Sequence, residues 1–251
     1  ERCNQKYLPG VAFPDNLELY SSLEDALSGG NLLVLIVIPS HAYRSFLESS
    51  ALLFNEEMSI AWASKGLEEG TGKLLHQVFS EEIPQCSRLA VISGPTFAKE
   101  VARDLPTAIT VASDMKEVAN EWRDCLHNGY FRAYTSNDIA GVELGGALKN
   151  PLAIAAGIAD GLGFGANSRA ALITRGLAEV MRLGDAMGCK RETFMGLAGL
   201  GDLVLTCTDD QSRNRRLGLA LADGKTIEQA KQEIEELSQR LNRYQHEYYV
   251  L

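Results

Sequence analysis

The chain has 251 residues, of which 45% are hydrophobic and 23% charged, a composition typical of a soluble globular protein with room for two domains. Its formal net charge of -9 argues against nucleic acid as the main partner, because phosphate backbones bind basic surfaces. The longest apolar run, residues 32–39, is too short to span a bilayer, so membrane insertion is not expected.

The first 137 residues alternate between strand-like and helix-like segments, which predicts a doubly wound α/β domain. A short strand is possible at 17–20, and Ser22 begins a helix. Residues 31–38, rich in β-branched side chains, read as a strand buried on both faces of a parallel sheet. The other expected strands are 58–63, 89–92, 107–111 and 131–134, and the helices are 41–53, 72–79, 95–102 and 116–127.

After Asp138 the pattern changes to long helical segments without a convincing strand. Helices are expected at 138–163, 168–187 and 191–195. The sequence therefore divides into an α/β domain at 1–137, an all-helical domain at 138–230 and a divergent helical tail at 231–251.

The cysteines are odd in number and widely spaced, without a CxxC pair, which favours reduced thiols in a cytoplasmic protein over a zinc site. They are Cys3, Cys86, Cys125, Cys189 and Cys207. The chain begins with Glu1 and shows no signal-peptide pattern, so we expect an upstream segment to be missing.

Two of the strand ends carry groups that suit an anion, which matters because ligands of open α/β sheets bind beyond the carboxyl ends of strands. Lys65 comes directly after one expected strand. Residues 93–96 form a Ser-Gly-Pro-Thr turn between a strand and a helix, and its free amides suit an anionic ligand.

Lys149 stands in a long stretch of small and apolar residues, where an ammonium group is costly to bury. One helical turn back lie Gly145 and Gly146, so the amine has either a ligand-sized space beside it or a simple helix break. Local spacing leaves these two readings level.

An acid in the second domain, Asp202, follows three glycines and precedes Leu-Val-Leu, so it needs a partner, and Lys149 is a candidate. The set Ser212, Arg213 and Asn214 offers hydroxyl, guanidinium and amide donors that suit a phosphate. Composition alone slightly favours a solvated charged turn for that set.

Several of these motifs, in order, closely resemble the bacterial NAD(P)-dependent glycerol-3-phosphate dehydrogenases over residues 1 to about 230. The motifs are PSH at 39–41, WASKG at 62–66, ISGPTFAKE at 92–100, LGGALKN at 144–150, GAN at 165–167, GLGDLVLTCT at 199–208 and QSRNRR at 211–216. The resemblance implies hydride transfer between NAD or NADP and the C2 carbon of dihydroxyacetone phosphate, giving sn-glycerol 3-phosphate for phospholipid synthesis.

The resemblance also implies roles for single residues. Lys149 would accept the alcohol proton, or donate it in reduction, because partial burial lowers a lysine pKa toward neutrality. Asp202 would orient the amine or the substrate hydroxyls. Lys65, Gly94 and Thr96 match substrate contacts, Ser212, Arg213 and Asn214 match phosphate contacts, and Lys65, Ala98 and Arg213 match cofactor contacts. No metal is implied, and a homodimer is compatible with the resemblance.

The chain departs from the family pattern at both ends. The first βα unit, with the GxGxxG turn that would cradle the pyrophosphate, does not precede Glu1. After about residue 230 the sequence is similar to the opening helix of NAD-dependent DNA ligase, where a tyrosine near Tyr248 would meet nicotinamide, although an amphipathic helix without that function is the preferred interpretation.

Two other functions stay open from the sequence. One is a non-catalytic fragment or binding module, since the phosphate-binding turn is absent. The other is a sister dehydrogenase of another hydroxy acid or sugar acid, against which the Ser212–Asn214 set argues by favouring a phosphorylated substrate.

Overall fold

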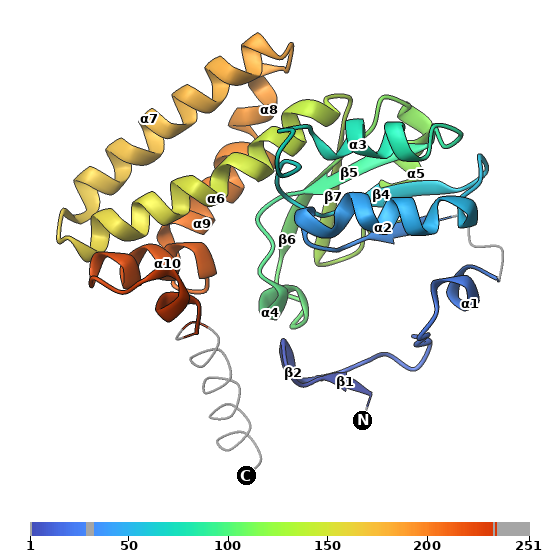
Figure 1. Ribbon diagram of the computed structural model, residues 1–251, viewed down its shortest axis with the longest axis horizontal. Helices are drawn as coiled ribbons and strands as arrows, with labels where there is room; N and C mark the ends of the chain where they lie inside the picture. The colour runs from blue at the N-terminus through green and yellow to red at the C-terminus, as the bar shows by residue number, and fades with distance from the viewer. Residues whose placement is uncertain (1, 29–32, 233, 235–251) are drawn as a thin grey trace.

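A five-stranded sheet forms the centre of the α/β half of the computed structural model, which describes residues 2–28, 33–232 and 234 (Figure 1). The strands follow one another across the sheet in chain order. They are β3 Leu33–Ile36, β4 Ser59–Trp62, β5 Leu89–Ser93, β6 Thr107–Ala112 and β7 Phe131–Ser136. Each overlaps a strand expected from the sequence, and the α/β class with a helical second part is confirmed.

One strand pair departs from the predicted parallel arrangement. β3, β4 and β5 are parallel, and β6 and β7 are parallel to each other, but β5 and β6 pair antiparallel. The connection between β5 and β6 contains only the one-turn helix α4, Ala98–Val101. Because no long helix carries the chain back across the sheet there, β6 returns in the opposite direction.

The two faces of the sheet are covered by different helices, since successive strand residues point to opposite sides. Ile60 and Trp62 pack with α2, Tyr43–Ser50, and α3, Leu75–Glu82. Ala61 belongs to the core on the other face, together with Trp122 of α5, Lys116–Leu126. Short 3₁₀ turns, Ser40–Ala42 and Ala51–Leu53, flank α2 within the helix expected at 41–53.

β3 is an edge strand, and the prediction that it is buried on both faces is wrong. Val34 and Ile36 join the core beneath α2. Leu35 and Val37 are 42% and 65% exposed, because the helix on the other face, α5, packs over the strands further across the sheet.

The first residues form a hairpin that the sequence did not suggest. β1, Cys3–Asn4, pairs antiparallel with β2, Leu8–Ala12. The strand expected at 17–20 is absent, since those residues have no regular structure. Ser22 does cap α1, Leu23–Leu27, as its side-chain oxygen accepts a hydrogen bond from Asp25 N at 3.1 Å.

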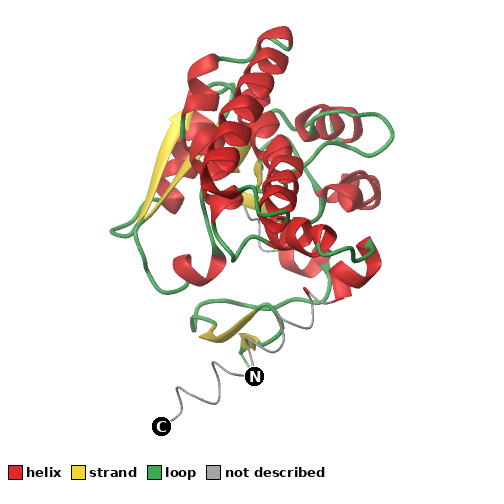
Figure 2. Cartoon of the chain, turned by 90° about the vertical axis from the view of Figure 1, so that its left-hand side faces the viewer, coloured by secondary structure: helices red, strands yellow, loops and turns green. Residues whose placement is uncertain are grey.

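Helices make up the described part of the chain after β7, and Figure 2 shows them in front of the sheet. They are α6 Ile139–Gly161, α7 Gly165–Ala186, α8 Arg191–Met195, α9 Asp202–Thr208 and α10 Arg213–Ala222, with a π-helical turn at Leu197–Gly201. α9 and α10 were not expected, because the glycine-rich and charged stretches around them read as turns. The divergent tail lies almost wholly outside the described residues.

The long helix α6 connects the two halves. It begins beside the sheet, where Ile139 and Val142 join the core under α2 and α3, and extends into the helical half (Figure 1). At its far end α6 meets α10 backbone to backbone, since a Cβ atom on Gly157 would lie 2.1 Å from the carbonyl oxygen of Arg215. Asp160 adds ion pairs to Arg169 of α7 at 2.8 Å and to Arg215 of α10 at 2.7 Å. No helix in the described part of the chain is long and apolar enough to cross a membrane.

Candidate active site

Four elements meet where the carboxyl ends of β4 and β5 face the helical half. Lys65 follows β4 and Ser93 ends β5. Lys149 lies in the middle of α6, and Asp202 is the first residue of α9. Residues separated by as many as 137 positions in the sequence are thereby brought into contact.

A single carboxylate joins the two lysines. Asp202 Oδ1 lies 2.5 Å from Lys149 Nζ, and Asp202 Oδ2 lies 2.6 Å from Lys65 Nζ. Lys149 Nζ also donates to Thr206 Oγ1 at 3.2 Å, one helical turn beyond Asp202. The pairing of Asp202 with Lys149, a candidate from the sequence, is therefore present, and Lys65 completes it.

The electrostatics of this cluster favour an anionic ligand and make the Lys149 amine easier to deprotonate. The Asp202 side chain is 2% exposed and that of Lys149 is 12% exposed, whereas Lys65 reaches the surface with 22%. The pKa of Lys149 is lowered to about 8, mainly by burial and then by the charge of Lys65, against the opposing effect of Asp202. Asp202 carries one negative charge against the two lysines, so the cluster has a net positive charge while both amines are protonated. Lys149 loses its proton near pH 8, and Lys65 then balances Asp202.

Gly145 and Gly146 serve close packing on one side of α6, and α6 runs unbroken through both, so the interpretation of a simple helix break is wrong. A Cβ atom on Gly145 would lie 2.7 Å from the carbonyl oxygen of Ala198, in the π-helical turn before α9. One on Gly146 would meet Ser93 Oγ at 3.3 Å and Lys65 Cγ at 3.5 Å. The missing side chains bring α6 against the turn that presents Asp202 and against the strand ends that present Lys65.

The start of α10 forms a second border of the site. Asn214 donates from Nδ2 to Asn150 Oδ1 at 2.8 Å, which places α10 beside the residue that follows Lys149. Ser212 is buried as the N-cap of α10, where its Oγ accepts from Arg215 N at 3.2 Å. Arg213 is exposed, and within the described residues no hydrogen bond or ion pair occupies its guanidinium group.

The turn after β5 leads into α4, which contacts the segment before α10. Gln211 Nε2 donates to Glu100 Oε1 at 3.1 Å, which links α4 to the segment before α10. Gly94 needs to be glycine, because a Cβ atom there would lie 2.9 Å from Ile109 Cα. Its carbonyl oxygen accepts from Thr96 Oγ1 at 3.3 Å and from Lys65 Nζ at 3.4 Å, while Ala98 begins α4.

Sequence reasoning missed three polar groups at this site. Thr206 lies four residues after Asp202, on the same face of α9. Asn150 follows Lys149 directly, a signal that was available. Ser93 Oγ is buried without a hydrogen-bond partner among the described residues, and no local pattern predicts that.

A cavity of about 260 Å³ lies apart from this cluster, lined by His76, Ser80, Pro84, Cys86, Ser87, Leu89, Ser113, Asp114 and Ile139. Leu89 begins β5, so this cavity lies at the opposite end of the strands from Lys65. The charges and the lysine with a lowered pKa identify the Lys149 cluster, and not this cavity, as the candidate active site.

Comparison with known proteins gives consistent matches along the chain. Family models match residues 1–119, as the NAD-dependent glycerol-3-phosphate dehydrogenase N-terminus, and residues 138–248, as the C-terminus of the same family. A glycerol-3-phosphate dehydrogenase [NAD(P)+] of Thioalkalivibrio sulfidiphilus is 59% identical over 228 residues, which cover 91% of this chain and 68% of the relative. One from Pseudoalteromonas translucida is 55% identical over 92% of this chain and 69% of the relative.

A solved structure is also similar. The crystal structure of glycerol-3-phosphate dehydrogenase from Coxiella burnetii superimposes with a TM-score of 0.89 and 48% identity, covering 97% of this chain and 75% of that one. The chain thus spans about two thirds to three quarters of the proteins it matches.

Proposed function

The chain belongs to the NAD-dependent glycerol-3-phosphate dehydrogenase family, and from this we propose that its Lys149 cluster interconverts sn-glycerol 3-phosphate and dihydroxyacetone phosphate. NAD or NADP is the cofactor of this family, and glycerol 3-phosphate supplies phospholipid synthesis. The observation that carries the proposal is the buried carboxylate of Asp202, which holds the Lys149 amine 2.5 Å away and the Lys65 amine 2.6 Å away.

In this proposal Lys149 moves the proton. The neutral amine accepts the proton of the C2 hydroxyl when the alcohol is oxidised, and the ammonium group returns it to the carbonyl oxygen in reduction. Asp202 orients the amine, and Thr206 accepts from it at 3.2 Å. Lys65, the more exposed of the two lysines, supplies positive charge for the anionic substrate.

The residues around the cluster fit a nicotinamide. Ser93 Oγ is a buried hydroxyl that no described group satisfies, and it lies at the end of β5 beside Lys65 and α6. Ser93 and Lys65 would hold the polar carboxamide edge, with Ala98 and Arg213 as further cofactor contacts. The bound cofactor supplies and takes up the hydride at C2.

The phosphate of the substrate would lie at the start of α10. Arg213, Asn214 and the first backbone amides of this ten-residue helix supply hydrogen-bond donors at its start, and a helix N-terminus favours an anion. Ser212 supports this place as the cap of α10. The hydrogen bond from Asn214 to Asn150 joins it to the Lys149 cluster.

The proposal predicts opposite pH dependences for the two directions. Because the pKa of Lys149 is about 8, oxidation should rise with pH and level off above about 8, while reduction should fall over the same range. Initial rates of NAD(P) reduction with glycerol 3-phosphate, and of NAD(P)H oxidation with dihydroxyacetone phosphate, measure both from pH 6 to 10. Parallel profiles in the two directions would contradict the role of Lys149.

The lowered pKa of Lys149 also makes the stability of the fold depend on pH, in a direction that follows from the shift. The pKa of Lys149 is lowered from 10.5 to about 8 in the fold, so the unfolded chain binds more protons between these values. The contribution of Lys149 to stability therefore increases as pH rises through that window.

Replacing Arg213 with alanine should raise the KM for dihydroxyacetone phosphate by about tenfold to a hundredfold, with a smaller effect on kcat, since one charged phosphate contact is lost. Steady-state rates with varied substrate measure this. Arg182→Ala is the matched control, because Arg182 is an exposed arginine of α7 that pairs with Glu179 on its own helix. An unchanged KM in Arg213→Ala would remove Arg213 from the phosphate site.

A cytoplasmic location is also proposed, in keeping with cysteines that are all free. Burial raises the pKa of the Cys207 thiol to about 11, which keeps that thiol protonated and unreactive at neutral pH. The expected homodimer rests on the family resemblance alone.

A further inference from the structure

Glu143 is a buried carboxylate on α6 to which the reaction described above gives no role. Its side chain is 2% exposed. Burying a carboxylate is costly unless hydrogen bonds satisfy it, and Glu143 has three. Its Oε1 accepts from Trp62 Nε1 at 2.9 Å and from His76 N at 3.0 Å, and its Oε2 lies 2.5 Å from His76 Nδ1.

These partners lie at the two ends of the segment that carries Lys65. Trp62 is the last residue of β4, three positions before Lys65. His76 lies in the first turn of α3, just after the loop that Lys65 opens. One carboxylate of α6 therefore holds both the entrance and the exit of the Lys65 loop.

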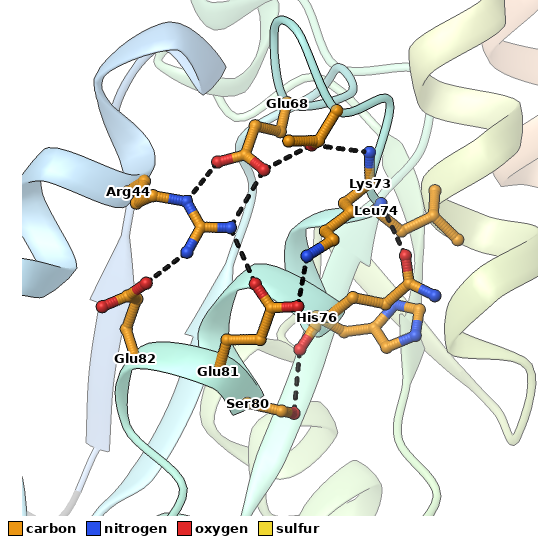
Figure 3. A network of polar contacts seen from close by, with 10 residues as sticks. Arg44, Glu68, Lys73, Leu74, His76, Ser80, Glu81 and Glu82 are labelled. Carbon is orange, nitrogen blue, oxygen red and sulfur yellow. Dashed lines mark hydrogen bonds and ion pairs between the residues drawn. The ribbon is translucent and has the colours of Figure 1, made fainter.

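The outer part of that loop is held separately (Figure 3). Arg44 of α2 pairs with Glu68 in the loop and with Glu81 and Glu82 on α3. Lys73 also pairs with Glu81, at 2.5 Å. Ion pairs hold the outer part of the loop to α2 and α3, and Glu143 holds its two ends to α6. Residues 62–76, here called the Lys65 segment, therefore form one unit whose position relative to α6 depends on Glu143.

Glu143 and Lys149 lie six residues apart on the same helix, a rise of about 9 Å. The helix fixes the position of Lys149 relative to Glu143, and the hydrogen bonds of Glu143 fix the segment bearing Lys65. The distance between the two lysines that contact Asp202 is therefore set by helix α6 and by the side chain of Glu143.

We propose that Glu143 is a positioning residue, which sets the placement of Lys65 against Lys149 by binding both ends of the Lys65 segment to α6. The inference rests on the proposed function, because it assigns Glu143 to the geometry of that site. Glu143 does not touch the reacting atoms and acts only through the placement of the two lysines.

The test is Glu143→Gln, which keeps the size of the side chain but loses the negative charge and cannot accept at both terminal atoms. If Glu143→Gln releases the Lys65 segment, Lys65 moves away from Lys149 and the repulsion between the two amines weakens. The pKa of Lys149 then rises above about 8. Direct loss of a nearby negative charge would instead lower that pKa. The sign of the change therefore separates placement from simple charge.

The pKa of Lys149 is measured without turnover, from the pH dependence of its acetylation by trace acetic anhydride, read by mass spectrometry. In parallel, kcat for dihydroxyacetone phosphate reduction should fall by about tenfold to a hundredfold, the effect of displacing a catalytic group by about 1 Å. Trp62→Phe, which removes the indole donor and keeps a smaller aromatic ring against Phe79, should change the pKa of Lys149 in the same direction.

Ser59→Ala is the matched control, because it removes another buried indole contact on β4, from Trp122 Nε1 at 3.0 Å, at the far end of the strand. It should lower the urea midpoint without changing the pKa of Lys149. An unchanged or lowered pKa in Glu143→Gln, or an equal rise in Ser59→Ala, would overturn the proposal. A wild-type chain whose Lys149 titrates near 8 but which does not turn over would count against the proposed function instead.

Discussion

Lys149→Ala is expected to lower kcat by about a thousandfold in both directions, because the group that carries the proton to and from the C2 oxygen is removed. The fold should persist, since Asp202 keeps its ion pair with Lys65. Absorbance of the reduced cofactor measures the rate, and circular dichroism checks the fold.

Two comparisons make the Lys149→Ala result specific. Lys116→Ala, at an exposed lysine of α5, should leave kcat unchanged. Adding a small primary amine to Lys149→Ala should restore part of the rate, with a pH dependence that follows the pKa of the added amine. A residual rate within tenfold of the wild type would mean that another group moves the proton.

Asp202→Asn should be the most destabilising single change in the site. It removes the carboxylate charge that offsets two ammonium groups at 2.5 and 2.6 Å, inside a site where Asp202 is 2% exposed. Breaking a buried ion pair in this way costs about 3 kcal/mol or more of unfolding free energy. The pKa of Lys149 should also fall below about 8, since Asp202 is the group that raises it.

Urea denaturation at pH 7 measures the stability of Asp202→Asn. Asp185→Asn is the matched control, because Asp185 pairs with Arg191 at the surface, where solvent screening leaves an ion pair little effect on stability. Equal losses in the two variants would show that Asp202 is not compensating buried positive charge. We expect kcat to fall by about a hundredfold as well, since the amine loses its orienting partner.

The regular elements were predictable where the pattern is local. Runs such as 58–63 and 131–134 contain alternating or β-branched residues that fit a pleated strand, and β4 and β7 form there. The long helix α6 was predictable because small and apolar residues dominate this stretch. The hairpin at residues 3–12 was not, since Pro9-Gly10 usually marks a turn and here lies within β2.

Other features depend on partners far away in the sequence. The antiparallel pairing of β5 and β6 is set by the course of a short connection, which no residue pattern in either strand records. The sequence around Gly145 gives no sign of its close contact with the backbone at Ala198, more than fifty residues later. Lys149 and Asp202 were paired correctly because two opposite charges in apolar surroundings need each other.

Because α6 is continuous, the number of residues between its functional groups sets the directions in which they point. Glu143 near its start contacts the Lys65 segment, Lys149 near its middle faces Asp202, and Asp160 near its end pairs with α7 and α10. An α-helix turns by about 100° per residue, so one inserted or deleted residue between Glu143 and Asp160 would swing one group out of register with the others. A substitution on this helix leaves the register of these three groups intact, whereas a change in the length of the helix would break it.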